Sequence, residues 1–166
     1  MDTKHGEDAI AWSDAFVLGY GPMDDVHEEF VMLVRAMQQA RDEELAGSLE
    51  VFNMHAKAHF DAEDAWMVET DFPARGCHIE EHAAVLRSVQ QVRARLAHAD
   101  YAVARRLADE LASWFPGHAD YLDSALAHWM CKRRLGGKPV VLRRGVQQAV
   151  MRTMPDRDAA ASTKVD

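Results

Sequence analysis

Cysteine and long hydrophobic runs are scarce in this sequence. Of its 166 residues only Cys77 and Cys131 are cysteine, so a disulfide framework is not expected and both thiols should be reduced. No run of about eighteen apolar residues is present, and residues 1–8 lack the basic and then apolar layout of a signal peptide. We therefore expect a cytoplasmic protein that does not enter a membrane.

Positive charge is also scarce over most of the chain. Residues 1–131 contain 10 Lys and Arg against 24 Asp and Glu, whereas residues 132–166 contain 9 against 3. Nucleic-acid binding needs a basic surface that displaces counterions. The acidic body therefore argues against nucleic acid as a partner.

Hydrophobic periodicity predicts four helices and no strands. Apolar residues recur every three or four positions over about 22–41, 44–70 and 74–97, and again from 101 to the glycine pair at 136–137. Short connections between amphipathic helices favour an all-α, antiparallel up-down four-helix bundle. Pro116 interrupts the last helix, but the inward-facing period continues beyond it, which predicts a kink and not a break.

The expected bundle leaves a segment at each end of the chain. Residues 1–20 show no clear period and should form an N-terminal arm over the core, so that arm and bundle together occupy residues 1–135. We expect residues 136–166 to be a C-terminal extension with a short basic helix over 140–154 and a disordered tail after it. Such a helix would contact the acidic bundle of its own or a second copy, or a protein partner. The alternative is a tail without a binding role.

Polar residues interrupt the inward-facing stripes of all four predicted helices. His59 and Glu63 lie four residues apart and therefore share one helix face, and His78 and His82 repeat this spacing. Buried histidines and carboxylates are costly unless a partner such as a metal neutralises them. Seven donors overfill one tetrahedral site and favour two ions bridged by two carboxylates. The candidate metal ligands are His27, His59, Glu63, His78, His82, His118 and Asp123.

Several nearby residues compete with these candidates or accompany them. Asp120 lies closer in sequence to His118 than Asp123 does. His55 precedes His59 by one turn, and we expect it to hydrogen-bond near the site without binding metal. Cys77 adjoins His78 but should point away from the metal and serve in packing. The remaining histidines, His5, His98 and His128, are interpreted as surface residues.

These motifs resemble the hemerythrin family, in particular the single-domain bacteriohemerythrins. The resemblance covers about residues 12–129, and its five-residue spacing in the last helix favours Asp123 over Asp120. It rests on Asp24-x-x-His27, His59-Phe60-x-x-Glu63 followed by Met67 and Phe72-Pro73, His78-x-x-x-His82, and Trp114-x-x-x-His118-x-x-x-x-Asp123.

The resemblance implies a non-haem centre of two iron ions that binds O2 reversibly. By position, the histidines at 78, 82 and 118 would hold one iron and those at 27 and 59 the other. Glu63 and Asp123 would bridge both ions together with an oxo or hydroxo group. The second iron would keep an open position for O2, and also for NO or a small anion such as azide. The expected lining of the O2 pocket is Phe30, Phe60, Trp114 and Ala119.

The function implied by the resemblance is oxygen storage, delivery or buffering, and not catalysis. A peroxidase-like side activity would be compatible with this function. Two alternatives stay open: an O2 or NO sensor module that acts through a partner, and a di-iron redox enzyme or iron-handling protein. Ala119 stands where the family commonly has a larger aliphatic residue, and Pro116-Gly117 precedes the ligand of that helix. These departures predict a roomier or more mobile pocket and faster autoxidation.

Overall fold

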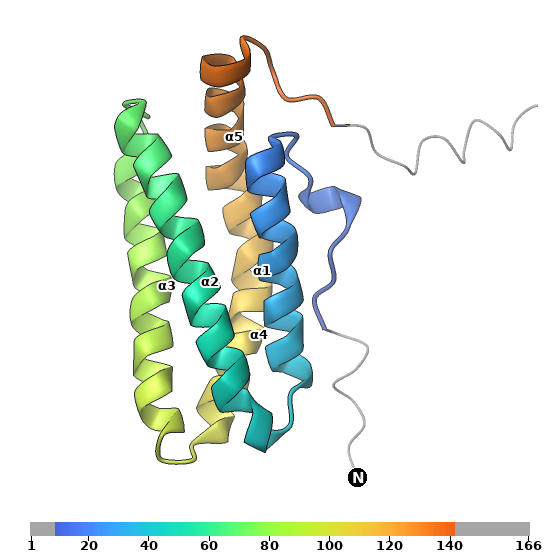
Figure 1. Cartoon of the computed structure of the whole chain (residues 1–166), viewed down its shortest axis with the longest axis vertical. Helices are drawn as coiled ribbons and strands as arrows, with labels where there is room; N and C mark the ends of the chain where they lie inside the picture. Colours follow the sequence, from blue (N-terminus) through green and yellow to red (C-terminus); the bar gives the residue numbers. More distant parts are fainter. Residues whose placement is uncertain (1–8, 142–166) are drawn as a thin grey trace, which may run out of the picture.

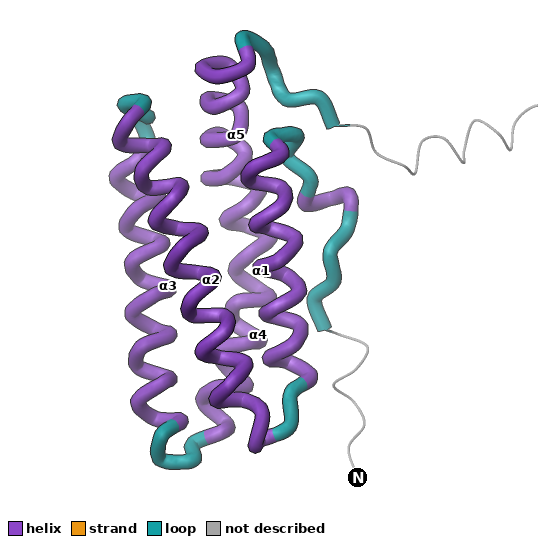
Figure 2. The backbone as a smooth tube through the Cα atoms, in the orientation of Figure 1, coloured by secondary structure: helices purple, strands orange, loops and turns teal. Residues whose placement is uncertain are grey.

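The computed structural model describes residues 9–141, and these form an antiparallel four-helix bundle (Figures 1 and 2). Each helical column packs against two neighbours, in the cyclic order in which they follow along the chain. The prediction of an all-α bundle is confirmed, and the described residues contain no strand. The columns are α1 (Gly21–Gln39), α2 (Asp42–Glu69), α3 (Arg75–Leu96), and a fourth that joins α4 (Tyr101–His118) to α5 (Ser124–Met130).

The fourth column changes its helical pitch twice without a loop. A π-helical turn, Ala119–Asp123, separates α4 from α5, and a second, Cys131–Leu135, follows α5. Pro116 lies inside α4, so the prediction that the helix continues through the proline is confirmed. Gly136 ends the column in the left-handed conformation with φ 68°, which glycine adopts without steric cost.

Local sequence explains where α1, α2 and α4 begin. Pro22 occupies the first turn of α1, where its missing N–H is not needed. At the start of α2, the Glu44 carboxylate accepts a hydrogen bond from the Arg41 backbone N–H at 3.0 Å. At the start of α4, the Asp100 carboxylate accepts one from the Val103 N–H at 3.3 Å. Such caps satisfy amide groups that the helix itself leaves unpaired.

Two apolar clusters fill the bundle, and a polar layer lies between them. The larger cluster contains Phe30, Phe52 and Leu111, and the smaller one contains Met23 and Met130. Along α1, α2 and the fourth column the buried polar residues fall between members of the two clusters. The buried histidines of α3 fall between Phe72, which precedes the helix, and Val85 of the larger cluster. The apolar clusters thus close the core on both sides of the polar layer.

The N-terminal arm runs beside α1 (Figure 1) and contains one short 3₁₀ turn, Asp14–Phe16. The Asp24 carboxylate accepts hydrogen bonds from the backbone N–H groups of Leu18 at 2.7 Å and Gly19 at 2.9 Å. The ring of Phe16 packs edge-on against Phe115 with 5.4 Å between centroids. The expected irregular arm is therefore present over residues 9–20, and Asp24 anchors it to the bundle.

The C-terminal extension is described only as far as residue 141. The expected basic helix over 140–154 and the tail after it lie almost wholly outside the described residues, so those expectations stay predictions. Within 9–141, no helix combines the length and apolarity needed to cross a bilayer. Cys77 is exposed, Cys131 is buried, and neither forms a disulfide.

Candidate metal centre

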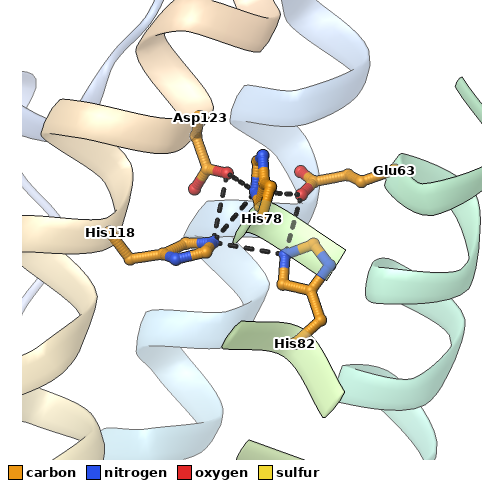
Figure 3. A group of neighbouring side chains, drawn as sticks. All are labelled: Glu63, His78, His82, His118 and Asp123. Atoms are coloured by element: carbon orange, nitrogen blue, oxygen red, sulfur yellow. Dashed lines mark hydrogen bonds and ion pairs between the residues drawn. The ribbon is translucent and has the colours of Figure 1, made fainter. Parts of the chain in front are cut away.

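All seven residues predicted as metal ligands meet in the polar layer of the core. Every helical column contributes at least one, and none of the seven is more than 5% exposed. Their potential ligand atoms fall into two groups that share Glu63, with the atoms of each group within 4.8 Å of one another. The groups are Glu63, His78, His82, His118 and Asp123 (Figure 3) and, next to them, His27, His59 and Glu63.

The first π-helical turn brings Asp123 into this layer. Five residues along a regular α-helix correspond to a rotation of about 500°, which would place Asp123 roughly 140° away from His118. A π-helical turn contains an extra residue and reduces this offset. His118 Nε2 and Asp123 Oδ1 are 3.3 Å apart, whereas Asp120 is exposed.

Three histidines converge on one point, which we call the three-histidine position (Figure 3). The Nε2 atom of His118 lies 3.2 Å from the Nε2 atoms of both His78 and His82. Asp123 Oδ1 is 3.0 Å from His78 Nε2, and Glu63 Oε2 is 3.4 Å from His82 Nε2. Three nitrogens and two carboxylate oxygens thus face the same small space.

His27 and His59 face a second point, the two-histidine position. Glu63 Oε1 lies 3.5 Å from His27 Nε2 and 3.1 Å from His59 Nε2. Asp123 Oδ2 lies 3.2 Å from His27 Nε2. Each carboxylate therefore directs one oxygen to each position, which is the arrangement that a bridge between two ions requires.

The donor set fits a pair of metal ions better than it fits a hydrogen-bonded core. Glu63 Oε2 and both carboxylate oxygens of Asp123 are buried, and although imidazole nitrogens lie 3.0–3.4 Å away, these contacts lack the geometry of a hydrogen bond. A buried polar atom without a hydrogen bond costs about 1–3 kcal/mol. Close Nε2 atoms cannot all satisfy one another, because a neutral imidazole has only one N–H. Imidazole and carboxylate together suit divalent iron, among other transition metals.

The charges within the layer also favour cations. Burial alone would lower the pKa of His27, but the carboxylates of Asp123 and Glu63 raise it to about 9. Burial would raise the pKa of Asp123, yet His118, His27 and His78 hold it well below its usual range. Burial and Asp123 would likewise raise the pKa of Glu63, which His27 and His59 lower to about 2. Both carboxylates therefore stay ionised in the core.

Known proteins with similar sequences identify the family of this chain. The model of the hemerythrin HHE cation binding domain matches residues 18–129, a range that contains all seven residues. The chain belongs to the hemerythrin family. A bacteriohemerythrin from Ralstonia nicotianae (strain ATCC BAA-1114 / GMI1000) is 39% identical over 124 residues, which cover 75% of this chain and 90% of that protein. No solved structure matches the chain.

Two further carboxylates contact, from outside, histidines of the seven-residue cluster, which we call the hemerythrin centre. His82 Nδ1 is 2.8 Å from Asp64 Oδ1, and His118 Nδ1 is 3.0 Å from Glu81 Oε2. Burial raises the pKa of Asp64 to about 6. Neither residue was predicted from the sequence, although each is next to a candidate ligand in the chain.

His55 has the position predicted for it, beside the hemerythrin centre and outside its donor set. Its ring lies 5.7 Å from that of His59. One ring nitrogen is 3.2 Å from the Val26 carbonyl oxygen and the other is 3.2 Å from the Glu29 carboxylate. Burial, and then His59, lower the pKa of His55. His98 and His128 are exposed, as predicted, whereas His5 lies outside the described residues. Cys77 is also exposed, so the prediction that it packs in the core is wrong.

Aromatic rings surround the histidines of the hemerythrin centre. Phe60 stacks on His82 with 4.1 Å between centroids, and Trp114 lies 4.2 Å from His118. Phe30 is 6.0 Å from His59. Phe115 packs edge-on to His27 with 5.3 Å between centroids. It was not among the residues predicted to surround the site, although its place three residues before His118 puts it on the inward face of the helix.

Proposed function

We propose that the seven side chains hold two iron ions and that the centre binds O2 reversibly, for oxygen storage, delivery or buffering. One observation carries the proposal: Glu63 and Asp123 each direct one oxygen to the three-histidine position and the other to the two-histidine position. When bound, the iron pair would supply the electrons and the open coordination position that reversible O2 binding needs.

The surroundings of the two-histidine position favour binding without turnover. His27 and His59 are neighbours of the buried rings of Phe115 and Phe30. Such a wall excludes water and proton donors from a bound ligand. Ala119, which is also buried, is proposed to line the ligand pocket with Phe30, Phe60 and Trp114.

The ligand balance supports the same conclusion. Five neutral imidazoles and two carboxylates place less negative charge on the metal ions than the glutamate-rich sites of other di-iron bundles. Because anionic ligands stabilise high oxidation states of iron, a site with fewer of them stabilises those states less. Outside the donor set, His55 is occupied by Val26 and Glu29, which argues against its use as an acid or base in catalysis.

The experiment that tests this proposal measures metal content and visible absorption together. Protein is reduced without air, exposed to O2 and then returned to an O2-free atmosphere. We expect two irons per chain and an absorption band that appears with O2 and fades when O2 is withdrawn. Azide should occupy the same position and suppress the O2 band.

A matched pair of variants makes the test specific. Asp123→Asn removes a proposed bridging carboxylate and should abolish the band, whereas Asp120→Asn changes an exposed residue three positions away and should leave it intact. One bound zinc, or iron that oxidises without a lasting coloured adduct, would contradict the proposal. Continuous O2 consumption would favour the enzyme alternative.

A further inference from the structure

Two hydrogen bonds distinguish the three-histidine position from the two-histidine position. At the former, His82 and His118 use their Nδ1 atoms to contact Asp64 and Glu81. At the latter, the Nδ1 atoms of His27 and His59 are buried and form no hydrogen bond, and the same holds for His78 Nδ1. Asp64 and Glu81, which we call the outer carboxylates, therefore contact histidines of the three-histidine position only.

The chemistry of these contacts fixes their direction. An ionised carboxylate only accepts hydrogen bonds, so each imidazole must donate its Nδ1–H and keep the lone pair on Nε2. The two Nε2 atoms indeed point into the centre, 3.2 Å from each other. Asp64 and Glu81 thus select the tautomer of His82 and His118 in which Nε2 can bind a metal.

Each outer carboxylate also connects neighbouring helical columns. Asp64 belongs to α2 and reaches a histidine of α3, and Glu81 belongs to α3 and reaches a histidine at the end of α4. Glu81 Oε2 additionally accepts a hydrogen bond from Trp114 Nε1–H at 3.3 Å. The Trp114 ring lies 4.2 Å from the His118 ring, tilted by 30°. Carboxylate and indole therefore restrain this imidazole from two sides.

We propose that Asp64 and Glu81 are positioning residues that make the three-histidine position the tighter of the two and thereby set the order of metal loading. A carboxylate behind a metal-bound imidazole fixes its orientation and increases its basicity, and loss of such a partner costs about 10- to 100-fold in metal affinity. The inference rests on the proposed function, because it takes the seven side chains as ligands of two ions.

The experiment titrates the metal-free, full-length protein with Co²⁺ and records the visible absorption of each binding step. Wild-type protein should take up Co²⁺ in two resolved steps, the first at the three-histidine position. Asp64→Ala and Glu81→Ala should each weaken the first step by about 10- to 100-fold and leave the second unchanged. Asp64→Asn keeps an acceptor oxygen without its charge and should fall between wild type and Asp64→Ala.

Matched controls lie on the same helices. Asp61→Ala removes an exposed carboxylate of α2 that pairs with Lys57 at 2.6 Å, and Glu80→Ala removes an exposed one next to Glu81; both should bind Co²⁺ as wild type does. The melting temperature of each metal-free variant is measured in parallel, since a merely structural role would lower it without changing the ratio of the two steps.

The inference is overturned if Asp64→Ala and Glu81→Ala leave both steps unchanged or weaken both equally. A wild-type protein that takes up fewer than two Co²⁺ ions would instead contradict the proposed function, so the two failures are distinguishable.

Discussion

The larger apolar cluster and the polar layer are equally buried but differ in what completes them. In the apolar cluster, Phe30 and Phe52 are both 0% exposed and pack edge-on at 5.1 Å, so the side chains satisfy one another. In the polar layer, Glu63 and Asp123 are also 0% exposed, yet oxygens of both form no hydrogen bond. The apolar cluster is complete within the chain, whereas the polar layer is not.

This difference indicates that the apolar clusters stabilise the fold and that the polar layer serves the function. Burial of apolar surface drives the association of the helices, and the resulting bundle holds seven polar groups at a cost in stability. Ions that bind only the folded state reduce that cost by linkage. The comparison predicts that the two regions respond differently to the same perturbations.

Metal removal should have the largest effect, and it should act through the polar layer alone. Metal-free protein is expected to remain helical but to lose about 4 kcal/mol of stability per ion, the linkage expected at a thousandfold excess of metal over its dissociation constant. Far-ultraviolet circular dichroism and thermal melting, before and after chelation, measure both quantities. Loss of the helical signal on chelation would show that the apolar clusters do not suffice for folding.

Phe52→Ala should give the next largest effect, and it tests the apolar cluster. Removing a fully buried phenylalanine leaves a cavity and is expected to destabilise the protein by about 3–5 kcal/mol, with and without metal. Urea denaturation of both forms measures this loss. Val51→Ala, at a neighbouring residue that is 47% exposed, should change stability by less than about 0.5 kcal/mol. A Phe52→Ala protein with normal stability but fewer bound ions would contradict the separation of roles.

Asp24→Ala should have a smaller effect that is confined to the arm. The variant loses two hydrogen bonds from backbone N–H groups to a carboxylate, and we expect about 2 kcal/mol of local destabilisation. Hydrogen exchange over residues 10–19 measures the opening of the arm, with Asp25→Ala at the adjacent exposed position as the control. Unchanged protection in Asp24→Ala would show that other contacts hold the arm.

Ala119→Ile is expected to have the smallest effect, at the boundary between the two regions. Ala119 belongs to the larger apolar cluster and follows His118 directly. A larger side chain should restrict access to the centre and slow autoxidation by roughly fivefold, which corresponds to about 1 kcal/mol in the barrier. Decay of the O2-dependent band measures the rate, and Ala125→Ile at an exposed position is the control. An unchanged or faster rate of autoxidation would contradict the proposal that the small side chain at residue 119 speeds autoxidation.

Regular periodicity accounts for what could be predicted from the sequence. The stripes that contain Phe30, Leu49 and Val89 repeat every three or four residues, and they locate the four columns and the inward faces of His27, His59 and His82. The predicted starts of the first two helices, 22 and 44, lie within two residues of Gly21 and Asp42. Spacing of four along a helix is sufficient to place His78 and His82 on the same face.

Departures from periodicity account for what the sequence did not reveal. The π-helical turn at Ala119–Asp123 departs from the regular helical period, and its only signal in the sequence is the five-residue interval between two candidate ligands. Asp64 and Glu81 lie outside the inward stripes, and their contacts join different helices. Pairs such as Asp64 with His82 depend on the rotation and offset of two packed columns, which a single helix period does not contain.

Anomalous X-ray diffraction from crystals of the iron-loaded protein tests the central claim most directly. The account predicts two iron peaks, one among His78, His82 and His118 and the other beside His27 and His59, with Glu63 and Asp123 bridging them. A single peak, or two peaks that do not share these carboxylates, would contradict it.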